Sequence, residues 1–400
     1  MEVPMKAKSS MVAKFSSLFV LTLLLPCFGR AASGAHLVVD DDKVECPNAA
    51  FTRIQDAIDA ASPGDHIRVC KGIYVEQLTI RKALDIDADS GAVLMPNAMK
   101  QNTTSLFDGA GIATAILVAD TTDVSISGLT VDGVNNGIAG CSPDLEGITF
   151  QNASGSIQRA AVRNFKLGAG LGGCQSGTGF FVQSGGGGIS KVAIEGCTIH
   201  DFQKNGITAN EIGTSALIRR NVVTGIGPTA AIAQNGIQIG FGAGGAIARN
   251  TVTNSVFSPC TAVATCTAVA TNILVEQSDG VEVSGNRAGI SQVAIFVNGN
   301  RAAVEQNETF AATVFDGIRV EGNQEEVRRN RVFNGAEAGI FVVGNNNVLE
   351  DNVITEAAVG ILKETGSMGN LIAMNRFFDV PITVQDPPSS SLTKKTQPQR

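Results

Sequence analysis

Four ionisable residues between positions 201 and 219 form the chain's most concentrated chemical set. Asp201, Lys204, Glu211 and Arg219 combine two carboxylates with two cationic groups. Lys204 stands just before Gly206 and would lie at a turn that opens onto a strand. A lysine amine placed there could act as the base that takes a proton from a substrate. The alternative is a solvated turn that carries surface charges, because most exposed charges do no chemistry.

Metal-binding residue types do not cluster in this sequence. The three histidines, His36, His66 and His200, are far apart, and no Cys-x-x-Cys pair or Cys/His cluster occurs. The residues therefore predict no metal site.

Alternation along the apolar segments predicts two outward columns of side chains. If Ile207 points inward, then Thr208 points outward and Asn210 does so again. The same rule can be applied to every similar segment of the chain. The first column is then Thr149, Phe181, Thr208, Gln238, Leu274, Phe296, Arg319, Phe341 and Leu362. The second column is Gln151, Gln183, Asn210, Glu276, Asn298 and Glu321.

These columns predict a binding face for an extended sugar chain. Amides beside phenylalanine rings would repeat every ~4.8 Å along a sheet. The predicted substrate-binding residues are Gln151, Gln183, Asn210, Gln238, Glu276, Asn298, Arg319, Glu321, Phe296 and Phe341. The alternative is a solvated face whose rings are covered by inserted loops. In that interpretation Asp316, Arg319 and Glu321 are ordinary ion pairs between strands. The absence of tryptophan weakens the case for sugar stacking.

These columns depend on a repeat of about 22 residues, which is the strongest signal in the sequence. One element is a small residue followed by an apolar strand, as in Gly206-Ile207 and Gly339-Ile340. A second element places an asparagine after an apolar strand, at Asn221, Asn250, Asn286, Asn307, Asn330, Asn352 and Asn375. Short strands without helices at this period predict one coil of a parallel β-helix per repeat, in an all-β solenoid of about ten or more coils. We expect the asparagines at turns, where they tolerate left-handed backbone and hydrogen-bond to neighbouring coils.

The segments around the repeat predict the domain organisation. Residues 1–35 have the basic, apolar and small-residue order of a signal peptide, which predicts secretion or periplasmic export. Residues 36–66 contain apolar positions at helical spacing and predict a cap with a short amphipathic helix over the open first coil. Residues 67–385 form the β-helix, and the polar segment 386–400 predicts a disordered tail. Longer intervals at 167–188, 225–246 and 255–271 predict loops, where binding sites usually lie.

Charge and cysteine content limit the function classes. Without residues 1–35 the chain holds 26 basic and 36 acidic residues, which argues against nucleic acid and anionic membranes as partners. No long apolar run remains to span a membrane, and we expect a monomer. In an exported protein, disulfides are the expected state of cysteine pairs. The predicted pairs are Cys46–Cys70, Cys141–Cys174 and Cys260–Cys266, with Cys197 left over.

The opening segment, residues 51–76, resembles the cap of the pectate-lyase-like superfamily. The later coils are similar to bacterial right-handed parallel β-helix repeat proteins, and the resemblance covers roughly residues 37–380. It implies a right-handed β-helix. Lyases of this superfamily bind calcium through carboxylates and use a lysine or arginine base. The sequence strings typical of galacturonases and pectin methylesterases are absent here, so the resemblance fixes the fold and no reaction.

Three functions remain open at this point. The first is a non-catalytic exported protein that binds a polysaccharide or another surface polymer along the outward face. The second is a polysaccharide lyase or glycoside hydrolase that acts on an acidic polysaccharide near Lys204, with calcium if it is a lyase. The third is a structural or adhesive surface protein.

Overall fold

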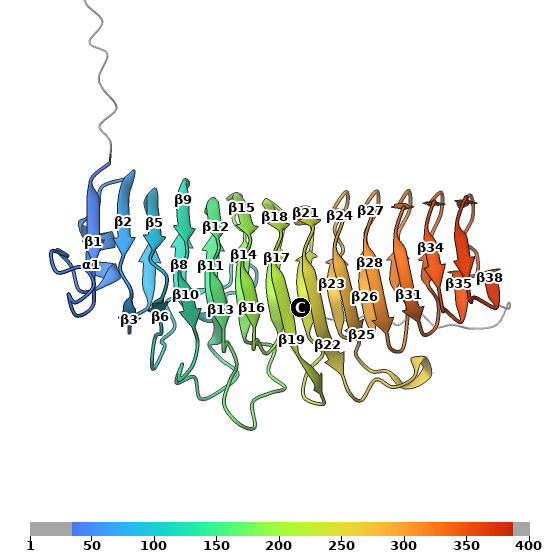
Figure 1. The fold of residues 1–400 in the computed structure, drawn as a ribbon, viewed down its shortest axis with the longest axis horizontal. Coiled ribbons are helices and arrows are strands. Elements are labelled where there is room, and N and C mark those ends of the chain that lie inside the picture. The colour runs from blue at the N-terminus through green and yellow to red at the C-terminus, as the bar shows by residue number, and fades with distance from the viewer. Residues whose placement is uncertain (1–33, 387–400) are drawn as a thin grey trace, which may run out of the picture. The chain divides into compact units, whose positions relative to one another are not determined.

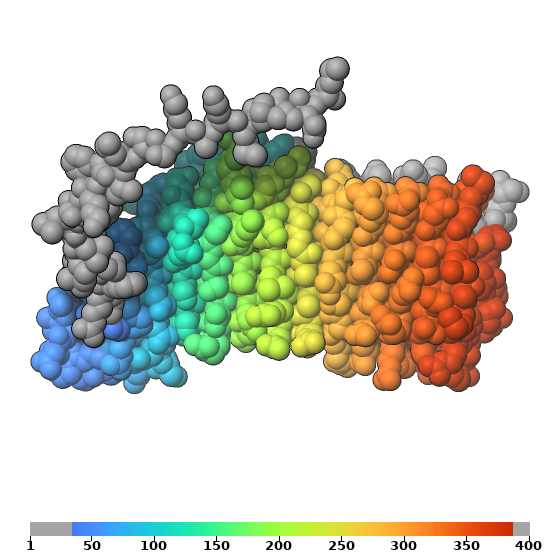
Figure 2. Space-filling view, turned by 90° about the horizontal axis from the view of Figure 1, so that it is seen from above, coloured from blue at the N-terminus to red at the C-terminus, as the bar shows by residue number. Residues whose placement is uncertain are grey.

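The computed structural model describes residues 34–386, which form a stack of coils built from three parallel sheets (Figure 1). Each coil contributes one strand to each sheet, and the coils follow one another in chain order along the stack (Figure 2). Thirteen strands form sheet A, twelve form sheet B and thirteen form sheet C. The predicted parallel β-helix of ten or more coils is confirmed.

The strand bounds are as follows. Sheet A contains β1 (His36–Val39), β2 (Asp65–Val69), β5 (Leu84–Ala88), β9 (Val124–Ser127), β12 (Gly155–Gln158), β15 (Ser190–Glu195), β18 (Thr214–Arg219), β21 (Gly244–Ala248), β24 (Glu282–Ser284), β27 (Ala303–Glu305), β30 (Glu326–Arg328), β33 (Val348–Glu350) and β36 (Leu371–Ala373). Sheet B contains β3 (Gly72–Tyr74), β6 (Ala92–Leu94), β10 (Thr130–Asp132), β13 (Ala161–Arg163), β16 (Thr198–His200), β19 (Val222–Thr229), β22 (Thr251–Phe257), β25 (Arg287–Ser291), β28 (Glu308–Ala312), β31 (Arg331–Gly335), β34 (Val353–Thr355) and β37 (Arg376–Phe378). Sheet C contains β4 (Leu78–Ile80), β7 (Thr103–Thr104), β8 (Gly111–Ala119), β11 (Asp144–Gln151), β14 (Thr178–Gln183), β17 (Asn205–Asn210), β20 (Asn235–Gly240), β23 (Thr271–Glu276), β26 (Val293–Asn298), β29 (Ile318–Glu321), β32 (Ile340–Val343), β35 (Val359–Lys363) and β38 (Ile382–Gln385).

The interior is a set of aliphatic stacks that run from coil to coil. In sheet A, Ile194 pairs with Ile218, and Ile218 pairs with Ile247, in exact register. All three side chains are fully buried, as are the valines that continue the stack, Val283 and Val304. Since side chains alternate along a strand, this register places every second residue inside and leaves the residue between them on the outer face.

Glycine opens several sheet C strands because neighbouring coils approach too closely there for a side chain. A Cβ atom on Gly206 would lie 2.5 Å from the carbonyl oxygen of Gly236 and 2.5 Å from Cγ1 of Val223. Glycine is therefore a steric requirement at this coil, whereas Asn272 and Ala294 occupy the same position in β23 and β26.

A ladder of buried asparagines joins the coils between sheets A and B. Asn307 donates from its backbone N–H and its Nδ2 to Oδ1 of Asn330, at 2.9 and 3.0 Å. Asn330 makes the same two bonds to Asn352, and Cys197 enters the ladder by donating its backbone N–H to Asn221. One expectation was wrong. The asparagines do not have left-handed backbone. The residue before each one does: φ is 57° at Arg220, before Asn221, and 54° at Arg329, before Asn330. The ladder asparagines thus act through their side-chain amides.

The predicted capping helix is confirmed as α1 (Ile54–Ala60), whose Ile54, Ala57 and Ile58 are buried against the first coil. The carboxylate of Glu76 caps its first turn by accepting the backbone N–H groups of Ile54 (2.7 Å) and Gln55 (3.1 Å). Sheet A begins already at β1, within the segment expected to be the cap.

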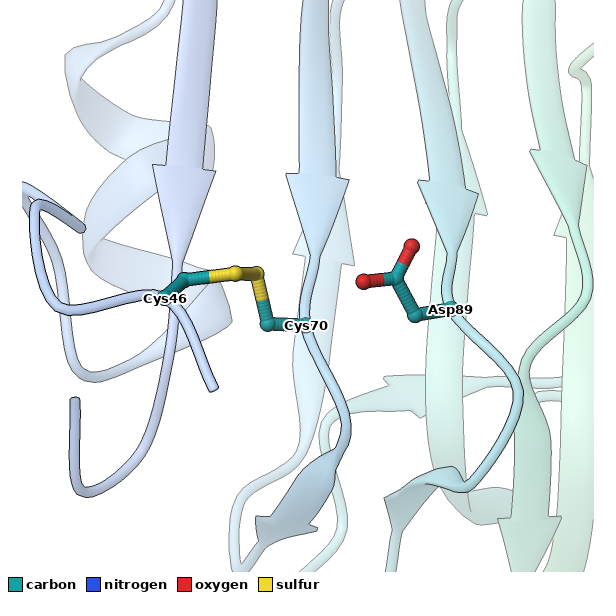
Figure 3. A group of neighbouring side chains, drawn as sticks. All are labelled: Cys46, Cys70 and Asp89. Atoms are coloured by element: carbon teal, nitrogen blue, oxygen red, sulfur yellow. A yellow bond between two sulfur atoms is a disulfide. The ribbon is translucent and has the colours of Figure 1, made fainter. Parts of the chain in front are cut away.

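The three predicted disulfides are confirmed: Cys46–Cys70, Cys141–Cys174 and Cys260–Cys266. The leftover Cys197 is buried and has a free thiol. Asp89 lies next to the first disulfide (Figure 3), but the sulfur atoms are bonded to each other and Asp89 pairs with Arg68 at 2.9 Å. This group therefore does not form a metal site.

The predicted signal peptide lies outside the described residues, apart from its last two positions, and so does the predicted tail after residue 386. Between residues 34 and 386, no helix has the length and apolar content needed to cross a membrane.

The asparagine ladder predicts the effect of a single amide deletion. The substitution Asn330→Ala removes the acceptor of two bonds from Asn307 and the donor to Val304, all in a buried position. We expect the free energy of unfolding to fall by roughly 2–4 kcal/mol, because buried polar groups lose their partners. Chemical denaturation measures this change. The exposed Asn323→Ala variant is the control and should lose less than about 1 kcal/mol; equal losses would contradict the ladder's role.

Candidate functional site

A cleft of about 150 Å³ opens on the outer face of sheet C, over strands β11, β14, β17 and β20. It is lined by Ser105, Phe107, Asp108, Ile112, Asp144, Glu146, Gln175, Thr178, Phe181, Gln183, Lys204, Asn205, Thr208, Asn210, Glu211, Gln238 and Phe241. Five of these side chains, Phe181, Gln183, Thr208, Asn210 and Gln238, hold outward positions that the alternation predicts, and the others come from the strand starts and from turns.

One wall of the cleft is the turn between β7 and β8, and two glutamines of sheet C fasten it. Gln183 accepts the backbone N–H of Leu106 (2.8 Å). Gln151 accepts the Thr103 hydroxyl (2.6 Å) and donates its Nε2 to the carbonyl oxygen of Thr104 (2.8 Å). Both glutamines were predicted to bind substrate, and in the structure they hold this wall in place.

Lys204 lies directly before β17 and is buried, with 7% of its surface exposed. Its Nζ donates to the carbonyl oxygen of Ala233 (3.1 Å), and its backbone N–H donates to Gly177 (2.9 Å). Both partners belong to segments that the longer repeat intervals identify as insertions. Burial lowers the pKa of Lys204 to about 7, so a large share of the amine is neutral near neutral pH.

Two carboxyls on β11 stand close to each other at this cleft. Burial raises the pKa of Glu146 to about 8, and the nearby charge of Asp144 adds to the shift. The Thr149 hydroxyl donates to Oε2 of Glu146 at 2.7 Å. This hydrogen bond lowers the pKa of Glu146, but by less than burial raises it. Burial and the charge of Asp108 raise the pKa of Asp144 to about 6. Glu146 is thus a proton donor at neutral pH, while Asp144 is mostly ionised.

The floor of the cleft is a network of side-chain amides. Asn205 donates its Nδ2 to the Thr208 hydroxyl (2.9 Å) and to Oε1 of Gln238 (3.2 Å), and Gln238 donates to Oδ1 of Asn210 (3.1 Å). Asn205 is 5% exposed, and its Oδ1 has no hydrogen-bond partner among the described residues. A buried amide oxygen without a partner is costly, and a ligand hydroxyl could satisfy it.

The structure brings together only part of the predicted ionisable set. Lys204 and Glu211 both line the cleft. Asp201 follows β16 on sheet B, where it accepts from His200 (2.7 Å) and pairs with Lys166 (3.4 Å). Arg219 ends β18 on sheet A and pairs with Glu195 at 2.7 Å. Asp201 and Arg219 are therefore on other sheets, and the cleft does not include them.

Both predicted outward columns exist in the expected register. Phe296 pairs with Leu274 and Arg319, and Arg319 pairs with Phe341, as the alternation requires. Loop covering, the alternative, is what happens to Phe296, which is 9% exposed and packs with Cys260, Cys266, Val314 and Phe315.

Several of the remaining predicted binding residues form ion pairs, hydrogen bonds and ring contacts with one another. The Arg319 guanidinium lies 4.1 Å from the ring centre of Phe341 and pairs with Asp316 (3.0 Å) and Glu321 (2.7 Å). Asn298 donates to Glu276 at 3.1 Å. Of the predicted binding residues, only Gln183, Asn210 and Gln238 reach the cleft.

The sequence analysis missed the carboxyls of the cleft. Asp144 and Glu146 stand two residues apart, directly before the Gly147-Ile148 start of the recognised repeat element. Strict alternation would have turned both inward, because Asp144 and Glu146 have the parity of the buried Ile148. They reach the cleft because the alternation breaks at Gly147, where a Cβ atom would meet the interior side chains of Val162 and Phe165. Asp108 has no sequence signal either, because it reaches the cleft through a turn outside the repeat.

The cleft does not contain a compact set of metal ligands. Within residues 34–386, only two groups of three Cys, His, Asp or Glu side chains bring their ligand atoms within 4.8 Å of one another; they are Asp40, Asp41 and Asp42, and Cys46, Cys70 and Asp89, and none of these residues lines the cleft. Calcium, which a lyase of the resembling superfamily would use, thus finds no such group at the cleft.

Comparison with known proteins supports the fold. A family model described as "Right handed beta helix region" matches residues 178–377. No curated protein matches the sequence.

Solved structures with similar folds include two classes of enzyme. A GH136 lacto-N-biosidase from Eubacterium ramulus has a TM-score of 0.55 and 12% identity, over 88% of this chain and 67% of that one. The A-module of the mannuronan C-5 epimerase AlgE6 from Azotobacter vinelandii has a TM-score of 0.54 and 14% identity, over 84% of this chain and 94% of that one. At these identities the likeness establishes the coil architecture alone.

The shifted pKa values predict opposite pH trends for two variants. The pKa of Glu146 is raised from 4.5 to about 8, so its contribution to stability is full below pH 4.5 and is lost as pH rises towards 8. The pKa of Lys204 is lowered from 10.5 to about 7, so its contribution is full above pH 10.5 and is lost as pH falls towards 7. The Tm of Glu146→Gln minus that of wild type should increase as pH rises from 4.5 to 8. The same difference for Lys204→Met should increase as pH falls from 10.5 to 7. Calorimetry across this range measures both; trends of the same sign would contradict the assignment.

Proposed function

The chain belongs to the right-handed β-helix family, and on this basis we propose that it binds a glycan in the cleft on sheet C. The observation that carries the proposal is the amide floor of the cleft, with phenylalanine rings beside it. Asn205, Asn210 and Gln238 present donors and acceptors of the kind that recognise sugar hydroxyls. Phe107, Phe181 and Phe241 line the same space and offer apolar surface for the faces of sugar rings.

The size of the cleft favours binding of one segment of a longer glycan over complete enclosure of a small ligand. Its volume of about 150 Å³ is below the ~300–1,000 Å³ of sites that bury a complete small molecule. An extended glycan could place one segment in the cleft and continue over the outward face of sheet C. The three disulfides fit an oxidising compartment, so we propose that the protein meets its glycan outside the cytosol.

The charge of the cleft favours a neutral glycan over a polyuronate. Asp144, mostly ionised at neutral pH, lines it together with Asp108 and Glu211, against the single amine among its lining residues, Lys204, while Glu146 is protonated. Carboxylates of an acidic polysaccharide would meet like charges in a partly desolvated space. The sequence-based binding hypothesis left the charge of the polysaccharide open, and we propose a neutral one; the acidic polysaccharide belonged to the enzyme alternative.

A second candidate function is cleavage of the bound glycan by acid–base chemistry. The observation that favours it is the gathering of carboxyls with separated pKa values in one cleft. Glu146, protonated near neutral pH, could donate a proton to a leaving oxygen, while the ionised Asp144 could activate water or stabilise positive charge. Lys204 with a pKa of about 7 could instead serve as the base of a lyase. The glycan-acting enzymes among the structural neighbours are compatible with either reaction.

Glycan binding is tested with an array of neutral and acidic polysaccharides. We expect binding to neutral glycans, weakened at least tenfold by Asn205→Ala, because the floor loses an acceptor and two donor contacts. Asn323→Ala changes an exposed amide of the turns between sheets C and A and should bind like wild type. No binding to any glycan would remove the proposal and favour the structural or adhesive alternative.

Cleavage is tested by incubating the bound glycan with the protein and following two products separately. New reducing ends without unsaturated sugars indicate hydrolysis, and absorbance of unsaturated products indicates a lyase. We expect Glu146→Gln to slow hydrolysis by about 100-fold or more, because it removes the proton donor. Lys204→Ala should abolish a lyase reaction. If neither product forms while the glycan binds, the protein is a binding protein only.

A further inference from the structure

Three consecutive aspartates follow β1 in the N-terminal cap, and we propose that Asp40, Asp41 and Asp42 bind a calcium ion there. Each of them offers a carboxylate oxygen, and these oxygens all lie within 4.8 Å of one another. The site is at the capped end of the solenoid. The inference does not depend on glycan binding.

Each carboxylate of the triplet is held in place by one backbone N–H group. Asp40 accepts from Cys46 through Oδ2 (2.5 Å) and Asp41 accepts from Ile73 through Oδ2 (2.9 Å). Asp42 accepts from Val44 through Oδ1 (2.9 Å). Hydrogen bonds of this kind fix the orientation of carboxylates that bind a metal, and each side chain keeps a second oxygen for the ion.

Asp40 provides an independent indication of a missing ligand. It is fully buried, yet its Oδ1 makes no hydrogen bond to any described residue. A buried carboxylate oxygen without a partner is strongly unfavourable. A bound ion would provide this atom with a partner.

The negative charge of the triplet also lacks a protein counter-charge. Among the ion pairs of residues 34–386, none joins a lysine or arginine to Asp40, Asp41 or Asp42. Lys71 pairs with Glu45 instead (3.7 Å), and Lys43, which follows Asp42 in the sequence, makes no ion pair with the triplet. Three neighbouring carboxylates repel one another, and a divalent cation would reverse that repulsion.

The donor types select calcium over other metals. The ligands are carboxylate oxygens, which hard cations prefer, and the adjacent sulfurs of Cys46 and Cys70 are bonded to each other. Calcium accepts irregular geometry and water ligands, whereas magnesium demands a near-ideal octahedron. Asp42 is exposed, so solvent can complete the coordination.

Calcium at this position would join three parts of the cap. Asp40 follows β1 and holds the Cys46 loop, and Asp41 holds the start of β3 through Ile73. The ion would thus tie the first strand to the second coil, next to the Cys46–Cys70 disulfide. Its role is stabilisation of the cap, with an affinity suited to calcium-rich surroundings, Kd about 10⁻⁴–10⁻³ M.

The proposal is tested by calorimetric titration of the full-length protein, first stripped with a chelator, with calcium chloride. We expect one site per chain and a rise in Tm of about 2 °C or more at ten times Kd. Asp42→Asn should weaken binding at least tenfold and remove the rise. Because Asp42 is exposed, this variant should fold, which circular dichroism in the absence of calcium verifies.

The control is Asp56→Asn, an exposed aspartate in α1 that belongs to no acidic group. It should bind calcium and gain Tm like wild type. Hydrogen exchange should slow around residues 39–46 and 72–74 when calcium is added. Absence of binding at millimolar calcium, or equal binding by Asp42→Asn, would overturn the proposal, whatever the result with glycans.

Discussion

In-register stacking of short coils is the constraint on which the whole structure depends. A single coil has too little interior to bury its own aliphatic side chains, so each one becomes stable only against its neighbours. The aliphatic stack through Ile194, Ile218 and Ile247 and the asparagine ladder impose the same register from two directions. A shift by one residue would turn the interior outward and break the ladder at once.

The same register explains how this fold forms the cleft on sheet C. Rigid strands place their outward side chains in straight columns, and such columns alone give a flat, solvated face. Insertions convert one part of that face into a cleft. The turn between β7 and β8 makes a wall, and the segments that contain Gly177 and Ala233 bury Lys204. Farther along the sheet, the Cys260–Cys266 loop covers Phe296 instead and closes the face. The inserted loops, more than the side-chain columns, therefore determine which part of the outer face of sheet C forms a cleft and which part is covered.

The repeating parts of the protein were predictable, and the inserted parts were not. The period, the small residue before each strand, the asparagine positions and the column that contains Phe296 and Arg319 all follow from local rules of alternation and turn chemistry. Lys204 was recognised as a chemical residue, but its burial depends on two insertions whose paths the sequence does not specify. Asp201 and Arg219 are near it in sequence, yet one coil visits three sheets, so neighbours in the chain point in three directions. Asp108 joins the cleft from a turn that follows no period at all.

The three disulfides are unevenly distributed along the solenoid. All of them lie before residue 267, whereas the coils from β23 onward are joined by sheet bonds, side-chain packing, the amide ladder and ion pairs such as Arg287–Glu308. The helix α1 closes the first coil, but the last coil exposes apolar side chains such as Leu371 and Phe378. Under mechanical load, the coils after β23 should therefore separate before the disulfide-linked coils that contain the cleft.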